Sequence, residues 1–229
     1  MQQSLNVDFK EAIDAAEARG VVLPDEYYNL LPEEARAIAF TVSQLTSATQ
    51  IQDVLDTLNK RIAEGATQKE WVADLLKKDF GLTKARLQTI VRTHTQTAYL
   101  AGHHRKYQVS KVTRPYLMYS AINDARVRPT HFAMDGIIKP VDDSFWKTFF
   151  PPNGFNCRCS VISLNERQAT KRGGVTSGVP DGAVVDDGWK HPPTLHAESA
   201  DDALNDKRTE FDAALLRALD LLQVLRQRN

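Results

Sequence analysis

Residues 123–160 read NDARVRPTHFAMDGIIKPVDDSFWKTFFPPNGFNCRCS. This segment contains both cysteines of the 229-residue chain, together with a histidine, three arginines and several carboxylates. Glycine, proline and asparagine interrupt it repeatedly, so no single helix or strand is expected to run through it. Such a composition is typical either of a polar site or of an irregular core whose shape is closely specified.

Short apolar and aromatic runs around these turns predict a small sheet, because aromatic and β-branched residues favour strands. The expected elements are strands at residues 116–119, 136–140 and 158–164, short helices at 130–134 and 144–149, and a loop at 151–154. We therefore expect residues 111–170 to form a compact α+β core with a few short strands, packed with a preceding helix over residues 83–109.

Signals for the start and end of helices recur through residues 1–110. Ser47 and Thr67 each precede a Gln or Glu three residues later, which is the pattern of a capped N-terminus. Thr83 precedes a longer apolar stripe, Asp8 can cap a first helix, and Pro32 can begin a second one. The expected helices span residues 8–20, 32–40, 47–65, 67–81 and 83–109. The N-terminal half is thus predicted to be predominantly helical.

The C-terminal quarter changes character twice. Residues 171–195 are rich in glycine and proline and poor in large apolar side chains, which predicts a linker. Residues 196–229 then place apolar side chains at helical spacing, which predicts a C-terminal amphipathic helix. Its apolar stripe consists of Leu204, Phe211, Leu215, Ala218, Leu222 and Leu225.

Charge and cysteine content limit the classes of function. The chain has 29 basic and 29 acidic residues, and this balance argues against wholesale neutralisation of nucleic-acid phosphates. No apolar run approaches the length of a membrane span and no leader pattern is present, so we expect neither a membrane segment nor a signal peptide. The two cysteines are expected to be free thiols, as is usual in a reducing cytoplasm.

A metal site is one interpretation of the central segment. His131, Asp135, Cys157 and Cys159 are residue types that bind zinc. His131 and Asp135 lie four residues apart, so a helix would place them on one face, and strand alternation would place both cysteines on one face. The alternative is that the cysteines are buried thiols that pack as small apolar groups beside a hydrogen-bonded histidine. We expect this second arrangement, with zinc as the alternative.

The charged residues of the same segment also have two interpretations. Paired carboxylates near a histidine suit acid–base chemistry or metal-assisted hydrolysis. They equally suit a network of ion pairs that ties loop to sheet. We expect the network and predict no catalytic residue, although Cys157 and His131 could form a nucleophile–base pair. The charged residues concerned are Asp124, Arg126, Arg128, Asp135 and Arg158.

Two features lie outside this segment. His94 falls on the apolar stripe of its predicted helix, close to Arg92, and is expected to be a hydrogen-bonded core histidine. A local basic patch suggests either a solvated helix end or contact with DNA. The patch consists of Arg105, Lys106, Lys111 and Arg114.

The central segment resembles the phage Mu F-like family of head morphogenesis proteins, also called minor head or minor capsid proteins, of tailed bacteriophages. The resemblance extends over residues 5–165 and includes a segment from Val91 to Gly102 that looks like a family helix. The residues that carry it, or that we expect to build the structural core around it, are Arg92, His94, Asp124, Arg126, Arg128, His131, Asp135, Gly136, Trp146, Pro151, Pro152, Asn153, Gly154, Asn156, Cys157, Arg158 and Cys159.

This resemblance implies a structural virion protein that acts in procapsid assembly. Its implied partners are the phage portal, a scaffold protein or the major capsid protein. Its implied location is the host cytoplasm during assembly and then the interior of the phage head. The alternative function is a metal-dependent nuclease or related hydrolase that uses His131, Asp135, Cys157 and Cys159.

Overall fold

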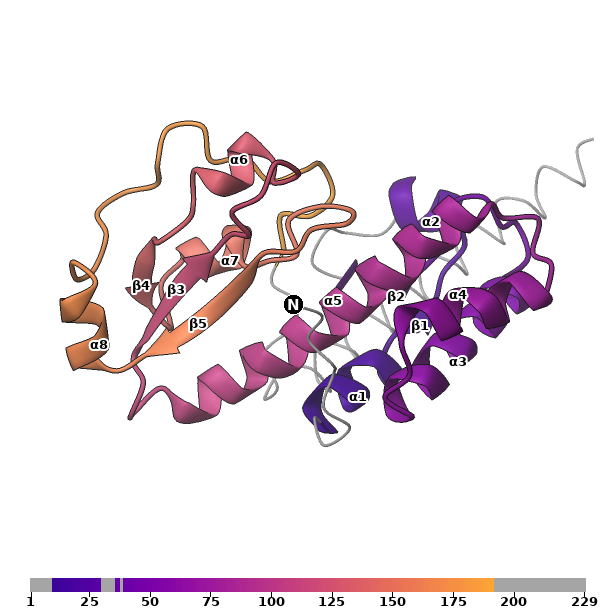
Figure 1. The fold of residues 1–229 in the computed structure, drawn as a ribbon, viewed down its shortest axis with the longest axis horizontal. Helices are drawn as coiled ribbons and strands as arrows, with labels where there is room; N and C mark the ends of the chain where they lie inside the picture. The colour runs from indigo at the N-terminus through magenta and orange to yellow at the C-terminus, as the bar shows by residue number, and fades with distance from the viewer. Residues whose placement is uncertain (1–9, 30–35, 38, 192–229) are drawn as a thin grey trace, which may run out of the picture. The chain divides into compact units, whose positions relative to one another are not determined.

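The computed structural model describes residues 10–29, 36–37 and 39–191. Helices dominate the first part of this region, and a three-stranded sheet with short helices follows (Figure 1). The predicted α+β class is therefore confirmed. The helices are α1 (Lys10–Glu17), α2 (Pro24–Asn29), α3 (Ala48–Ala63), α4 (Gln68–Lys77), α5 (Lys84–Ser110), α6 (Pro129–Phe132), α7 (Phe145–Phe149) and α8 (Glu166–Lys171), and the strands are β1 (Gly20–Val21), β2 (Ala39–Phe40), β3 (Tyr116–Ser120), β4 (Ile138–Pro140) and β5 (Ser160–Leu164).

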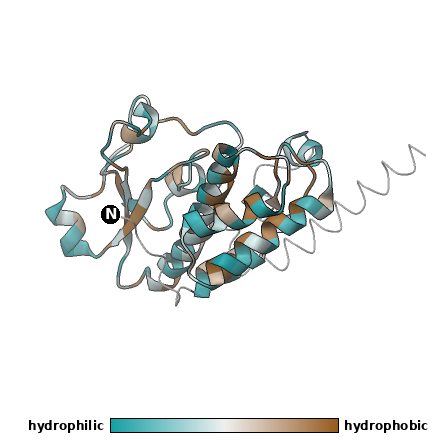
Figure 2. Ribbon diagram, turned by 45° about the vertical axis from the view of Figure 1, so that its right-hand side comes forward, coloured by the Kyte–Doolittle hydropathy of each residue, from teal (hydrophilic) through white to brown (hydrophobic). Residues whose placement is uncertain are grey.

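Local capping signals locate α3, α4 and α5 correctly. The Ser47 and Thr83 side chains accept hydrogen bonds from the backbone N–H three residues later. Thr67 and Glu70 form a complete capping box at α4. Each of these helices carries both hydrophobic and hydrophilic residues (Figure 2). Their hydrophobic residues, among them Ile51, Leu58 and Leu75, are buried together in one core.

The predicted helix at 32–40 is wrong at its C-terminal end. Ala39 and Phe40 instead form β2, which pairs in parallel with β1, and the Val22 N–H donates to the Phe40 carbonyl at 3.0 Å. This pairing is between segments about twenty residues apart, so helix periodicity within either segment does not indicate it. Helix α2 was not predicted, and Asp8 and Pro32 lie outside the described residues.

Helix α5 contributes to two hydrophobic cores. Leu87, Val91 and Ala98 pack with α3 and α4, whereas Leu100 and Tyr107 pack with the sheet residues Leu117 and Tyr119 and their neighbours. The Tyr107 hydroxyl donates to the Val161 carbonyl in β5 at 2.7 Å. One continuous helix thus connects the helical layer to the α+β core (Figure 1).

The sheet has the order β4–β3–β5, and both pairings are antiparallel. Leu117 and Tyr119 on β3 point into the core and are fully buried. All three predicted strands are present, but β4 and β5 begin two residues later than expected. Residues 157–159 precede β5 and contribute to the site described below instead of to the sheet.

Residues 172–191 contain no helix or strand but are anchored to the core. The Thr176 N–H donates to the Ile138 carbonyl at 2.8 Å, and the Thr176 hydroxyl accepts from the Ile138 N–H at 3.0 Å. Val185 is buried. The predicted C-terminal helix lies outside the described residues. Among the described residues, none of the helices combines the length and the apolar character needed to cross a membrane.

Candidate metal centre

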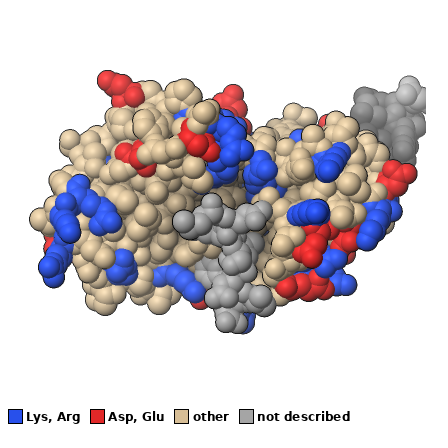
Figure 3. Space-filling model, viewed as in Figure 1, with Lys and Arg blue, Asp and Glu red and all other residues tan. Residues whose placement is uncertain are grey.

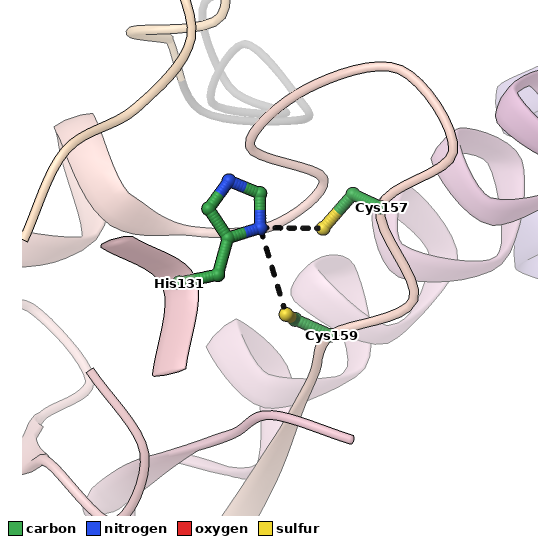
Figure 4. A group of neighbouring side chains, drawn as sticks. All are labelled: His131, Cys157 and Cys159. Atoms are coloured by element: carbon green, nitrogen blue, oxygen red, sulfur yellow. Dashed lines mark hydrogen bonds between the residues drawn. The ribbon is translucent and has the colours of Figure 1, made fainter. Parts of the chain in front are cut away.

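Three of the four proposed ligands come together in the core. The sulfur atoms of Cys157 and Cys159 lie 3.7 Å and 3.8 Å from the same ring nitrogen of His131, Nδ1. Figure 4 shows the imidazole directed between the two sulfur atoms. All three side chains are buried, and their ligand atoms lie within 4.8 Å of one another. Both cysteines are free thiols, as expected.

Local sequence chemistry positions each of these side chains. Pro129 occupies the start of α6 and fixes its first turn, which carries His131. Asn156 adopts a left-handed backbone with φ of 57°, a conformation that asparagine tolerates better than most residues. After this turn the Cys157 and Cys159 side chains both face His131.

Helix α5 holds this turn through Arg92, which was expected in the structural core, and through Thr89 and Gln96, which sequence reasoning did not assign. The Arg92 guanidinium donates to Asn156 Oδ1 at 3.1 Å, and Asn156 Nδ2 donates to Thr89 at 3.2 Å. The Gln96 amide donates to the Cys159 carbonyl at 2.8 Å. The cluster is therefore supported by a long, rigid element, which is the arrangement that keeps a site preorganised.

The two thiols have opposite electrostatic environments. The Cys157 thiol donates a hydrogen bond to the Cys159 sulfur, which raises the pKa of Cys157 well above its usual value. The same hydrogen bond, with further help from His131 and Tyr119, lowers the pKa of Cys159 to about 5. Cys157 is thus the poorer nucleophile, which argues against the proposed Cys157–His131 catalytic pair.

Asp186 lies on the other side of the imidazole, and sequence reasoning missed it. Its Oδ1 is 4.0 Å from His131 Nε2, a buried atom that makes no hydrogen bond. The Asp186 N–H donates to the Asn153 carbonyl at 3.1 Å, and a Cβ at Gly154 would collide with the Asp186 carboxylate. The only sequence signal nearby is Trp189, an aromatic residue in a polar segment, whose ring packs against Phe155.

Asp135, the fourth proposed ligand, does not join the cluster. Helix α6 ends at Phe132, so the helical spacing that would align His131 with Asp135 does not apply. Asp135 is exposed, and its carboxylate accepts a hydrogen bond from the Ala121 N–H at 2.8 Å. This contact closes the turn between β3 and β4, which is a structural role.

The charged residues form ion pairs, in agreement with the expected network. Arg158 donates from Nη1 and Nη2 to the two carboxylate oxygens of Asp124, each at 2.7 Å. This pairing holds the pKa of Asp124 well below its usual range. Arg128 bonds the Phe155 carbonyl at 2.8 Å and lies 3.4 Å from Asp186. Arg126 also contacts Asp124 at 3.3 Å, from a side chain that is 77% exposed.

The remaining motif residues shape the core around the cluster. Gly136 has a positive φ of 79° at the entry to β4, and the Trp146 indole donates to the Pro140 carbonyl at 2.8 Å. The Asn153 amide donates to the Phe149 carbonyl at 3.2 Å. Pro151, Pro152, Asn153 and Gly154 are all buried.

His94 lies in the helical layer and is hydrogen-bonded on both sides. Its Nδ1 accepts from Arg19 at 3.1 Å, and its Nε2–H donates to Asn59 Oδ1 at 3.1 Å. Burial and the nearby Arg19 charge lower the pKa of His94 well below its usual value. The geometry is that of the expected core histidine.

The predicted basic patch is largely paired within the chain. Lys106 lies 3.4 Å from Glu11, and Lys111 lies 3.1 Å from Asp142. Arg114 donates to Ser163 and Gln168. In Figure 3, acidic and basic side chains lie together at the right of the molecule, whereas basic side chains predominate at the lower left. These contacts favour the solvated helix end over contact with DNA, and no contact assigns Arg105 to either role.

A small hollow adjoins the two sulfur atoms and the imidazole. Its volume is about 20 Å³, and it is lined by Ile122, Arg126, Val127, Arg128, His131, Asn156, Cys157, Arg158 and Cys159. A space of this size holds about one water molecule. It has room for a single ion with one small ligand, and it is far smaller than pockets that bind organic ligands.

The fold and this site define an α+β protein with a buried cysteine–histidine cluster between a long helix and a small sheet. Residues 52–162, which include α4, α5, β3 and the whole cluster, match the family model described as Phage Mu protein F like protein. This segment matches the model of that family, and the resemblance found in the sequence is confirmed.

Three relatives show the same similarity. The chain is 34% identical over 158 residues to the Mu-like prophage FluMu F protein of Haemophilus influenzae, an alignment that covers 62% of this chain and 38% of that protein. It is 30% identical over 185 residues to the putative capsid assembly protein F of Escherichia phage Mu, covering 72% of this chain and 42% of that protein.

An uncharacterized protein of Methanocaldococcus jannaschii is 28% identical over 116 residues, which are 50% of this chain and 18% of that protein. The chain therefore spans less than half the length of each of these relatives. No solved structure matches it.

Proposed function

We propose that this protein is a structural component of a tailed-phage head that acts in capsid assembly. The observation that carries the proposal is the family match over residues 52–162, supported by the relative from phage Mu that is named a putative capsid assembly protein. The matched residues include the helix and the loop that build the cysteine–histidine cluster.

The finer part of the proposal is that the protein binds the portal or a scaffold protein inside the procapsid. A protein made for assembly needs a rigid body that presents a fixed surface. The described residues form such a body, in which α5 joins two hydrophobic cores. Assembly would take place in the host cytoplasm, and the protein would remain in the head.

Particle fractionation tests this function directly. The full chain, with an epitope tag, would be co-produced with the head proteins of the phage that encodes it, and particles would be separated on a density gradient. We expect the chain to co-sediment with procapsids and to crosslink to the portal or scaffold. Recovery only at the top of the gradient, with normal heads formed in its absence, would contradict an assembly role.

A hydrolase is less well supported by the geometry. Asp135 lies outside the cluster, and the adjoining hollow of about 20 Å³ has no room for a nucleotide. We therefore expect the purified protein to leave plasmid DNA intact in the presence of Mg²⁺ or Zn²⁺. Cleavage that Cys159→Ser abolishes would instead support the hydrolase.

A further inference from the structure

We propose that His131, Cys157 and Cys159 bind one zinc ion, and that Asp186 orients the imidazole of His131 from the Nε2 side of the ring. The inference rests on the geometry of this cluster and is independent of the role in capsid assembly. It also changes the ligand set expected from the sequence, because it excludes Asp135 and adds Asp186 as a supporting residue.

The distances between the ligand atoms fit a tetrahedral zinc ion. Zinc binds sulfur at about 2.3 Å and imidazole nitrogen at about 2.0–2.1 Å, which places a nitrogen and a sulfur on one tetrahedral ion about 3.6 Å apart. The two measured separations from His131 Nδ1 are 3.7 Å and 3.8 Å. The ligand atoms of the three residues all lie within 4.8 Å of one another (Figure 4).

Hydrogen bonding alone leaves this imidazole poorly satisfied. A neutral ring nitrogen either donates one hydrogen or accepts at one lone pair, so Nδ1 cannot serve two sulfur atoms well. His131 is only 1% exposed, and Nε2 makes no hydrogen bond although it is buried. A cation placed between the two sulfur atoms and Nδ1 satisfies all three donors at once.

Asp186 has the position of a second-shell carboxylate. Metal-binding histidines usually donate their other ring N–H to a carboxylate or carbonyl, which fixes the tautomer and strengthens the ligand. The Asp186 carboxylate faces His131 Nε2 at 4.0 Å and is itself held by Arg128 at 3.4 Å. With Nδ1 as the ligand, the Nε2–H is directed at Asp186, so both ring nitrogens acquire a role.

The donor set selects the metal. Two thiolates and an imidazole suit zinc, whereas Mg²⁺ and Ca²⁺ prefer oxygen ligands. Among the described residues, the group offers three His, Cys, Asp or Glu ligands, so a water molecule in the adjoining hollow would supply the fourth. Zn²⁺ with two thiolates and a neutral imidazole carries no net charge. Arg158 and Arg128 are meanwhile paired with Asp124 and Asp186.

Cobalt substitution of the full-length, reduced protein tests the site. Co²⁺ bound by two cysteines gives an intense sulfur-to-cobalt charge-transfer absorption, and we expect this band to saturate at one ion per chain and to disappear when Zn²⁺ is added. Cys157→Ser and Cys159→Ser should each abolish most of the band. Asp135→Asn is the matched control, because it alters a motif residue that lies outside the cluster, and it should keep the wild-type spectrum.

Asp186→Asn tests the supporting residue separately. We expect its cobalt spectrum to be retained while its zinc affinity falls about 10-fold to 100-fold. A folded, reduced wild-type protein that gives no cobalt–thiolate band would overturn the proposal, and so would serine variants that keep the full band. If the serine variants do not fold, the wild-type band and the affinity of Asp186→Asn still decide the question.

Discussion

At the scale of single residues, His94 shows how burial sets a charge state. Burial and the charge of Arg19, whose guanidinium donates to Nδ1, lower the pKa of His94, so the imidazole is neutral in the fold. In the unfolded chain a histidine has its ordinary pKa of about 6.5. Since the unfolded state binds the proton more readily, the stability that His94 contributes is complete above about pH 6.5 and is lost as the pH falls below it.

The replacement His94→Phe tests this interpretation. Phenylalanine keeps a ring against Phe40 but removes the partner of Arg19 and of Asn59, so we expect the free energy of unfolding at pH 7 to fall by about 2–4 kcal/mol. Denaturant titrations at pH 7 and pH 5.5 should also show that the free energy of unfolding falls less between these two pH values in the variant than in the wild type. Equal pH dependence in both proteins would contradict the assignment.

The Asp124–Arg158 pair gives a second prediction at this scale. Arg158→Lys keeps the positive charge but cannot make the two parallel hydrogen bonds to Asp124. We expect the melting temperature to fall by about 2–4 °C. Arg126→Lys is the control, because Arg126 contacts the same carboxylate from an exposed position, and it should melt like the wild type. Equal effects of the two replacements would show that the bidentate geometry is unimportant.

Individual residues were predictable from the sequence only where the chemistry is local. Ser47, Thr67 and Thr83 were assigned correctly because each caps a backbone group three residues away. Asp186 could not be assigned, because its partner His131 lies fifty-five residues earlier and Asp186 itself lies in a segment with the composition of a linker. Asp135 was misassigned because α6 is one turn long, which the spacing of the residues does not reveal.

At the scale of elements, the contact between α5 and β5 depends on one buried hydroxyl. Tyr107→Phe removes the hydrogen bond to the Val161 carbonyl while keeping the ring in the core. We expect a loss of about 1–2 kcal/mol in the free energy of unfolding, measured by denaturant titration. Tyr28→Phe, at a residue that is 43% exposed, should change it little. If Tyr107→Phe leaves the free energy of unfolding unchanged, packing alone joins the helix to the sheet.

Element types were predicted better than element ends. The three strands of the sheet follow from aromatic and β-branched runs, and the long helix follows from its cap and stripe. The β1–β2 pair was missed because each strand is two residues long and depends on its partner. The start of β5 was placed too early because Cys157 and Cys159 share the alternation of a strand although they face the cluster.

At the scale of the whole molecule, residues 10–191 contain the two cores and the cluster, and they belong to one compact unit that excludes residues 195–229. A chain that ends at His191 should therefore keep the melting temperature of the full protein within about 2 °C, since no buried contact described here is removed. Its incorporation into procapsids is expected to be lost if the C-terminal segment serves as an assembly arm. Normal incorporation would show that the compact unit carries the partner surface.

Helix α5 has a consequence for how the protein unfolds. Leu87 and Val91 belong to one core, and Leu100 and Tyr107 belong to the other, so neither core can melt without losing part of the same helix. Calorimetry should accordingly record a single cooperative transition for both cores. Amide protons near Ala98, where the two cores meet along α5, should exchange with solvent only through global unfolding. The shared helix should thereby make the two small cores unfold as one cooperative unit.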